Sequence, residues 1–110
     1  MTESSFNLKE HARDFVTREI GRSLRAKLFE FEDSSPRDIR LTIDTSGVSI
    51  MTPSFVDEFF GRTAATLGLD QFRARFNIVG VDENTKTLIN RVVRNRLLLD
   101  KAPERSPRVS

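Results

Sequence analysis

Hydrophobic residues in the first third of the chain recur at helical spacing. Between residues 11 and 31 an apolar position returns every four residues, which predicts one amphipathic helix with a buried stripe. The short apolar segment at residues 6–8 predicts an edge strand before this helix, and Pro36 ends the helix in a turn. The predicted stripe consists of Ala12, Val16, Ile20, Leu24 and Leu28, with Phe15 and Phe31 beside it.

The pattern then changes to an alternation of apolar and polar residues. At residues 39–44 the apolar side chains stand at every second position, which predicts a strand with one covered face. Residues 76–81 are nearly all apolar and predict a second, central strand. Both strands precede segments with helical spacing, so each connection is long enough for a helical crossover.

Residues 52–67 predict the helix between these strands. Thr52 is a candidate N-cap with Pro53 in the first turn, and Ser54 with Asp57 three residues later is the alternative cap. Gly68 suits the C-terminal stop, whereas Gly61 inside the helix indicates a close backbone contact. The apolar stripe of this helix is Phe55, Val56, Phe59, Phe60, Thr63, Ala64 and Leu67.

The last predicted helix begins near residues 82–84. Leu88, Ile89, Val92, Val93 and Leu97 form its core-facing stripe, while Lys86, Asn90, Arg91, Arg94 and Arg96 point elsewhere. The element order β-α-β-α-β-α with right-handed crossovers predicts an α/β fold with a small, largely parallel β-sheet covered by helices. We expect a single domain over residues 1–102 and a flexible tail over residues 103–110, which contain two prolines among polar residues.

Composition narrows the range of functions. The chain has 110 residues and no cysteine, so disulfides, zinc–thiolate sites and thiol nucleophiles are excluded. No apolar run approaches the ~18 residues of a membrane span and the N-terminus lacks a signal pattern, so we expect a cytoplasmic protein without a membrane anchor. The net charge is +2, and the excess of Lys and Arg lies in the last forty residues.

The candidate site is the point where the first alternating strand ends and the following helix begins. Sites in parallel sheets gather where strands end and helices begin, and two hydroxyls, Thr52 and Ser54, stand at this helix start. Asp57 and Glu58 follow in the first turns, where the helix dipole favours negative charge. They predict either surface ion pairs, Glu58 with Arg62 among them, or an acidic patch for a basic partner. The predicted partner-binding residues are Asp44, Ser46, Gly47, Thr52, Ser54, Asp57, Glu58 and Arg62.

Residues 43–51, Ile-Asp-Thr-Ser-Gly-Val-Ser-Ile-Met, followed by a helix start that carries hydroxyls, resemble the sulphate transporter and anti-sigma-factor antagonist (STAS) domain. The continuation, with Ser54-Phe55, Asp57-Glu58 and Gly61, resembles a bacterial branch, the STAS-like domain of unknown function. The resemblance covers residues 6 to 100, and Asn84 matches an Asn of that branch.

The resemblance implies a non-enzymatic regulator of signalling and transcription. Such a module binds a kinase-like ATPase or an anti-sigma-type regulator, and phosphorylation at the helix start releases it. This chain departs from the pattern, since the family's phosphorylated hydroxyl aligns with Pro53 and its preceding Asp with Thr52. A displaced phosphorylation at Ser54 or Thr52 remains a hypothesis, and capping is the alternative role for both hydroxyls.

Other classes of function stay open. The basic last helix suggests a nucleic-acid-binding regulator, although it lacks aromatic residues for stacking on bases. A hydrolase using Ser54 would need a base such as His11, the only histidine, and no Gly-x-Ser-x-Gly motif is present. We expect no catalytic residues, no metal and no cofactor, because the chain lacks a phosphate-binding Gly-rich loop and clustered metal ligands. A homodimer is a further expectation, because the adjacent Phe59 and Phe60 suggest that one ring is exposed.

Overall fold

The computed structural model describes residues 4–105 and shows an α/β fold with a three-stranded parallel sheet. The strands are β1 (Ser5–Asn7), β2 (Leu41–Asp44) and β3 (Phe76–Val79), and their order across the sheet is β1-β2-β3. Phe6 pairs with Ile43, which in turn pairs with Ile78. β2 is therefore the central strand, so the prediction that residues 76–81 form the central strand is wrong.

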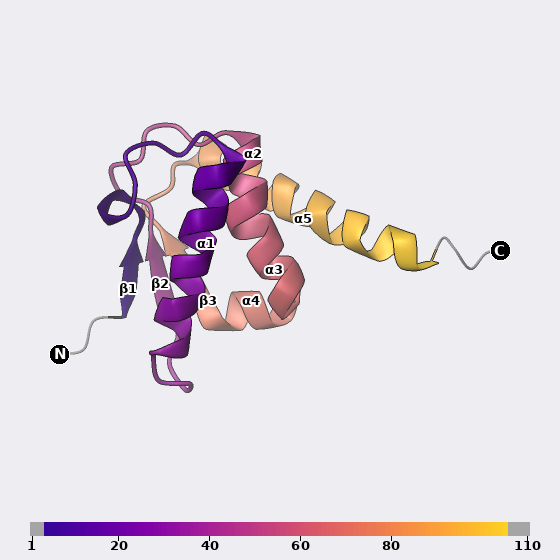
Figure 1. The fold of residues 1–110 in the computed structure, drawn as a ribbon, viewed down its shortest axis with the longest axis horizontal. Coiled ribbons are helices and arrows are strands. Elements are labelled where there is room, and N and C mark those ends of the chain that lie inside the picture. Colours follow the sequence, from indigo (N-terminus) through magenta and orange to yellow (C-terminus); the bar gives the residue numbers. More distant parts are fainter. Residues whose placement is uncertain (1–3, 106–110) are drawn as a thin grey trace.

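Each strand is followed by at least one helical segment (Figure 1). A 3-10 turn, η1 (Leu8–Glu10), and α1 (Arg18–Asp33) connect β1 to β2. Between β2 and β3 lie α2 (Pro53–Val56), the π-helical turn η2 (Asp57–Gly61), α3 (Arg62–Leu67) and α4 (Leu69–Arg75). The chain ends in α5 (Glu83–Arg105). The predicted parallel sheet with helical crossovers is confirmed.

The sheet has one covered and one open face. Phe6, Leu41, Ile43 and Phe76 are buried and face the helices, which lie together over that face (Figure 1). The alternate residues of the same strands, such as Thr42 and Asp44, are partly exposed. Alternation along a strand places successive side chains on opposite faces, so the observed burial agrees with the pattern at residues 39–44.

The first helix begins later than its periodicity predicted. α1 starts at Arg18, with Thr17 as the N-cap whose hydroxyl accepts a hydrogen bond from the Ile20 N–H at 3.2 Å. Residues 11–17 instead run as an irregular segment, with Phe15 buried and Val16 exposed. A side-chain N-cap satisfies an otherwise unpaired amide, and here it outweighs the apolar spacing of Ala12 and Val16.

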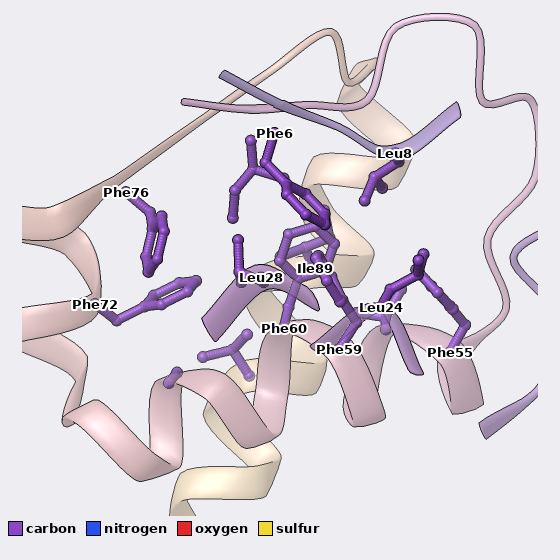
Figure 2. Close-up of a cluster of buried hydrophobic side chains, with 14 of the residues drawn as sticks. Phe6, Leu8, Leu24, Leu28, Phe55, Phe59, Phe60, Phe72, Phe76 and Ile89 are labelled. Carbon is purple, nitrogen blue, oxygen red and sulfur yellow. The ribbon is translucent and has the colours of Figure 1, made fainter. Parts of the chain in front are cut away.

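The core is built around phenylalanines from the helix that follows β2 (Figure 2). Phe55 stacks on Phe59 with ring centroids 5.6 Å apart, and Phe59 meets Phe60 edge-on at 4.8 Å. Both Phe59 and Phe60 are 0% exposed. The predicted apolar stripe of this helix is confirmed, but the argument for a homodimer from an exposed ring at these positions is wrong.

Two features in the second half of the chain were not predicted. α4 follows directly after Gly68, whose φ of +91° ends α3 at the predicted stop and redirects the chain. α5 extends past the rest of the fold (Figure 1) and is helical to Arg105, so residues 103–105 have helical backbone where we expected a tail. Residues 106–110 lie outside the described residues, and the division of the chain at residue 102 stays a prediction.

Candidate functional site

The helix start after β2 is capped by Thr52. Its hydroxyl accepts a hydrogen bond from the Phe55 N–H at 3.2 Å and donates one to the Val16 carbonyl at 2.6 Å. The Thr52 N–H donates to the Phe15 carbonyl at 3.2 Å. Thr52 is thus the N-cap, as the first of the two alternatives predicted, and it also joins this helix to the segment that precedes α1.

Ser54 is in a different situation from Thr52. It lies in the first turn of α2, is partly exposed, and its hydroxyl makes no hydrogen bond to any other residue between 4 and 99. Because Thr52 serves as the cap, the alternative cap at Ser54 is wrong. Of the two hydroxyls at the helix start, the one at Ser54 is therefore the one that a partner or a modifying enzyme can reach without breaking structural hydrogen bonds.

The turn after β2 is held by its own hydrogen bonds and by a close backbone contact. Asp44 Oδ1 accepts a hydrogen bond from the Ser46 N–H at 2.9 Å, and hydrogen bonds from Ser46 lower the pKa of Asp44. Gly47 has a φ of +82°, which favours glycine. A Cβ at Gly80 would lie 2.6 Å from the Ser46 nitrogen, so the loop after β3 packs directly on this turn.

The turn and the helix start border the same segment of chain. Phe15 and Val16 hold Thr52 through their carbonyls, and they also line a hollow of about 250 Å³ together with residues 47–50. Of the predicted site residues, Gly47 and Thr52 therefore lie against the segment at residues 9–17, and no hydrogen bond within the described chain joins the turn to Ser54.

Asp57 and Glu58 are buried, with exposed fractions of 9% and 5%. The turn that carries them, η2, is π-helical, and the Arg62 N–H bonds to the Asp57 carbonyl across five residues. A π-helical turn is wider than an α-helical one and inserts an extra residue into the helix. All five residues of η2 are buried, which places both carboxylates between α1 and α5 instead of on the surface.

Asp57 is paired mainly with α5. Arg96 approaches it with two nitrogens, Nε to Oδ1 at 2.9 Å and Nη2 to Oδ2 at 2.7 Å. Arg18 on α1 adds a third hydrogen bond to Oδ2 at 2.7 Å. The hydrogen bonds from Arg96 lower the pKa of Asp57 to about 2, against the opposing effect of burial and with the help of Arg18.

Glu58 is paired with α1 and with its own helix. Arg25 donates to its carboxylate at 3.0 Å and to its backbone carbonyl at 2.5 Å. Arg18, Arg22 and Arg62 lie between 3.3 and 3.8 Å from the carboxylate, so the predicted Glu58–Arg62 pair is confirmed. Burial acts to raise the pKa of Glu58, but the hydrogen bonds from Arg25 and Arg18 outweigh it, and the pKa is lowered.

The surface at Asp57 and Glu58 is positively charged, whereas the sequence predicted an acidic patch or surface ion pairs there. An acidic patch or a surface ion pair at Asp57 and Glu58 requires exposed carboxylates, and both are buried. The groups that reach solvent here are guanidiniums, since the side chains of Arg18, Arg22 and Arg62 are 48%, 60% and 46% exposed. We call the cluster of Asp57 and Glu58 with Arg18, Arg22, Arg25, Arg62 and Arg96 the carboxylate–arginine cluster.

Two glycines allow this cluster to form. A Cβ at Gly21 would lie 2.8 Å from the Glu58 Cβ, and a Cβ at Gly61 would lie 2.9 Å from Asp57 Oδ1 and 3.3 Å from the Arg96 Cβ. The close contact predicted for Gly61 is therefore confirmed. Gly21 was missed, although a lone glycine inside a strongly helical pattern was a usable signal.

His11 belongs to a different part of the molecule. Its ring stacks on Phe6 with centroids 4.4 Å apart, and it lines a hollow with residues of α1 such as Lys27 and Glu30. Among the side chains that the structure describes, those of residues 4–99, no group of three His, Asp or Glu could hold a metal ion. Across the same residues, no helix is both long enough and apolar enough to cross a membrane.

Sequence reasoning identified the position of the helix start but missed what surrounds its acidic residues. Arg18, Arg22 and Arg25 stand between the apolar positions of the first predicted helix, where the pattern alone predicts solvated side chains, and Arg96 is predicted only to point away from the core-facing stripe of the last helix. The spacing of the three arginines on α1, at intervals of four and three residues, places them on one helix face. That face was a signal for a shared acidic partner, but no feature of the sequence indicated which acidic residues it meets.

Comparison with known proteins supplies the family. The family model described as a STAS-like domain of unknown function matches residues 29–86, just over half of the chain. The matched segment begins in α1 and ends in α5, and it includes β2, the helix start and the turn η2. Searches of the curated proteins and of the solved structures found no match. The chain belongs to the family of STAS-like domains of unknown function.

Proposed function

We propose that this domain is a non-enzymatic, cytoplasmic regulatory module that binds a protein partner through the surface around Ser54. The surface comprises the start of α2, the turn at Asp44–Gly47 and the exposed arginines of the carboxylate–arginine cluster. The observation that carries the proposal is the hydroxyl of Ser54 in the first helical turn, which makes no hydrogen bond to another described side chain or backbone group. Asp57 and Glu58, which follow it in the sequence, are buried and hold the half-exposed Arg18 and Arg62. Membership of a STAS-like family supports a regulatory role.

The charge of this surface indicates the chemistry of the partner. Arg18, Arg22 and Arg62 present positive charge beside the helix start, and two carboxylates neutralise only part of the cluster. Complementary potentials steer association and favour one class of partner over another. The partner surface would therefore be acidic, and a kinase-like ATPase or an anti-sigma-type regulator is the class of protein that the family resemblance favours.

Phosphorylation of Ser54 would act on the same surface. Ser54 lies about one turn before Glu58 in the helix that follows β2. A phosphate adds roughly −1.5 to −2 charge and forms strong hydrogen bonds with nearby arginines. Arg18 bonds both Asp57 and Glu58 and is half exposed, so it is a candidate to turn toward the phosphate. The surface would lose its positive charge, and an acidic partner would be released.

Affinity capture from the native host tests the proposal. The bait is the full chain as wild type, as Ser54→Asp, and as Ser23→Asp, which makes the same change at an exposed serine of α1. We expect one protein partner to be retained by wild type and by Ser23→Asp and to be lost by Ser54→Asp. Phosphopeptide mass spectrometry on the chain isolated from the host then reports whether Ser54 carries phosphate.

The captured partner is then titrated against the three purified variants to measure affinity directly. Equal binding by all three variants would contradict the placement of the surface at Ser54. Capture that disappears on nuclease treatment would instead favour the nucleic-acid alternative, and charge reversal at Arg91 would then be the next change to make.

A further inference from the structure

A second candidate site lies far along the chain from the helix start, in a crevice between α4, β3 and α5. Its volume is about 300 Å³, near the lower end of the range for small-molecule pockets. Arg40, just before β2, closes one further side of it. The crevice shares no lining residue with the carboxylate–arginine cluster or with the turn at Asp44–Gly47.

The floor of the crevice is apolar. Phe72 and Phe76 contact each other with ring centroids 5.8 Å apart, and both rings are visible at one side of the core in Figure 2. Ile89 and Val93 on α5 complete the buried part of the floor. The apolar lining residues are Leu69, Phe72, Phe76, Ile78, Ile89, Val93 and Leu97. An apolar body placed here would be removed from water on several sides.

The rim of the crevice is positively charged. Arg40, Arg73 and Arg94 line it together with the amides Asn77 and Asn90, and none of the lining residues is acidic. Among residues 4–99, whose side chains the structure describes, these three arginines form no salt bridge. The only contact that joins them is a hydrogen bond from Arg40 Nη2 to the Arg73 backbone carbonyl at 2.9 Å, which leaves their charges uncompensated.

We propose that this crevice binds a small organic anion with an apolar body and one acidic head group. The apolar floor would hold the body, and the guanidiniums of Arg40, Arg73 and Arg94 would hold the head group. Guanidinium groups recognise carboxylates, sulfonates and phosphates through paired hydrogen bonds. Four segments of the chain wall the crevice, so its shape suits one compact molecule and not a long peptide laid along a groove.

Methyl NMR of the full chain, with labelled Ile, Leu and Val, tests this inference. The probes are decanoate and decyltrimethylammonium, which share the same alkyl chain and carry opposite charge, both kept below the concentration of micelle formation. We expect decanoate to shift the methyl signals of Ile78, Ile89 and Val93 saturably, and decyltrimethylammonium to leave them unchanged. Equal binding of both probes would overturn the role of the arginines, and no saturable shift with decanoate would overturn the site.

A charge-reversed variant and its matched control locate the head group. Arg94→Glu replaces an attraction at the rim with a repulsion, and we expect decanoate to bind about tenfold more weakly or worse. Arg91→Glu makes the same change at an exposed residue of α5 that does not line the crevice, and its affinity should match that of the wild type. If both variants bound decanoate equally weakly, the loss of affinity would follow from the change in net charge alone, and the proposed site would be contradicted.

Discussion

Arg94 and Arg96 lie two residues apart on α5 and have opposite roles. Arg96 turns inward and holds the buried carboxylate of Asp57 with two hydrogen bonds, whereas Arg94 lines an open crevice and is exposed. Residues two positions apart on a helix point to different sides. One helix therefore contributes a structural arginine to the carboxylate–arginine cluster and a rim arginine to the crevice.

The two regions differ in how their charges are compensated. In the carboxylate–arginine cluster, buried acids are surrounded by guanidiniums, and removing one partner leaves an uncompensated charge away from water. At the crevice, the arginines are exposed and have no acidic partner among the side chains of residues 4–99, so solvent screens them. The first arrangement should matter for stability, and the second is available for a ligand.

Asp57→Asn should give the largest effect. The amide cannot carry the negative charge that Arg96 and Arg18 require, and we expect a loss of about 2 to 3 kcal/mol in the free energy of unfolding. Denaturant unfolding followed by circular dichroism measures this loss. Asp70→Asn is the matched control, because Asp70 is exposed, and it should change stability by less than about 0.5 kcal/mol. Equal losses of stability in Asp57→Asn and Asp70→Asn would contradict the structural role of the carboxylate–arginine cluster.

The same pair predicts how stability depends on pH. Arg96 lowers the folded-state pKa of Asp57 from 3.8 to about 2, so this stabilisation is present above pH 4 and is lost as the pH falls toward 2. The difference corresponds to about 2 kcal/mol. Unfolding curves of wild type and Asp57→Asn between pH 7 and pH 2 measure it. The stability of the wild type should fall more steeply below pH 4, and parallel curves would contradict the pairing.

Gly21→Ala tests the same cluster from α1, the helix that packs on Glu58. The new methyl would lie 2.8 Å from the Glu58 Cβ and 3.1 Å from the Phe55 carbonyl oxygen, so the two helices must separate. Overpacking costs about 1 to 3 kcal/mol and the higher helix propensity of Ala returns up to about 1 kcal/mol, which leaves a net loss of about 1 kcal/mol. The thermal midpoint measures it, with Ser23→Ala as an exposed control. A stabilised Gly21→Ala would show that α1 does not pack tightly on Glu58.

Much of this fold was predictable, because it follows from local rules. Alternation at residues 39–44 identified β2, and the Thr52–Pro53 pair identified the start of α2 through N-cap and proline preferences. The predicted apolar stripe of the helix that follows β2, including Phe59, matched the observed burial. These features depend on residues near one another in the chain.

The errors concern contacts between residues far apart in sequence. Asp57 seemed suited to the surface because its partners, Arg18 and Arg96, lie 39 positions away in either direction. β3 was expected at the centre because it is apolar, yet it lies at the sheet edge, and Phe76 is the one of its four side chains that is buried. Neither the choice of ionic partners nor the strand order has a local signature, and the π-helical turn that buries the carboxylates had none either.

The smallest expected effect on stability belongs to the crevice. Arg94→Gln removes one of three positive charges around the rim, so we expect no loss of stability and a gain of a few tenths of a kcal/mol, about the size of an exposed charge interaction. The gain should vanish at high salt, because screening weakens repulsion between exposed charges. Denaturant unfolding at low and high ionic strength measures it, with Arg96→Gln as the contrasting variant that loses stability under both conditions. A loss above about 1 kcal/mol for Arg94→Gln would assign this guanidinium a structural role and would weaken the case for a ligand at the crevice.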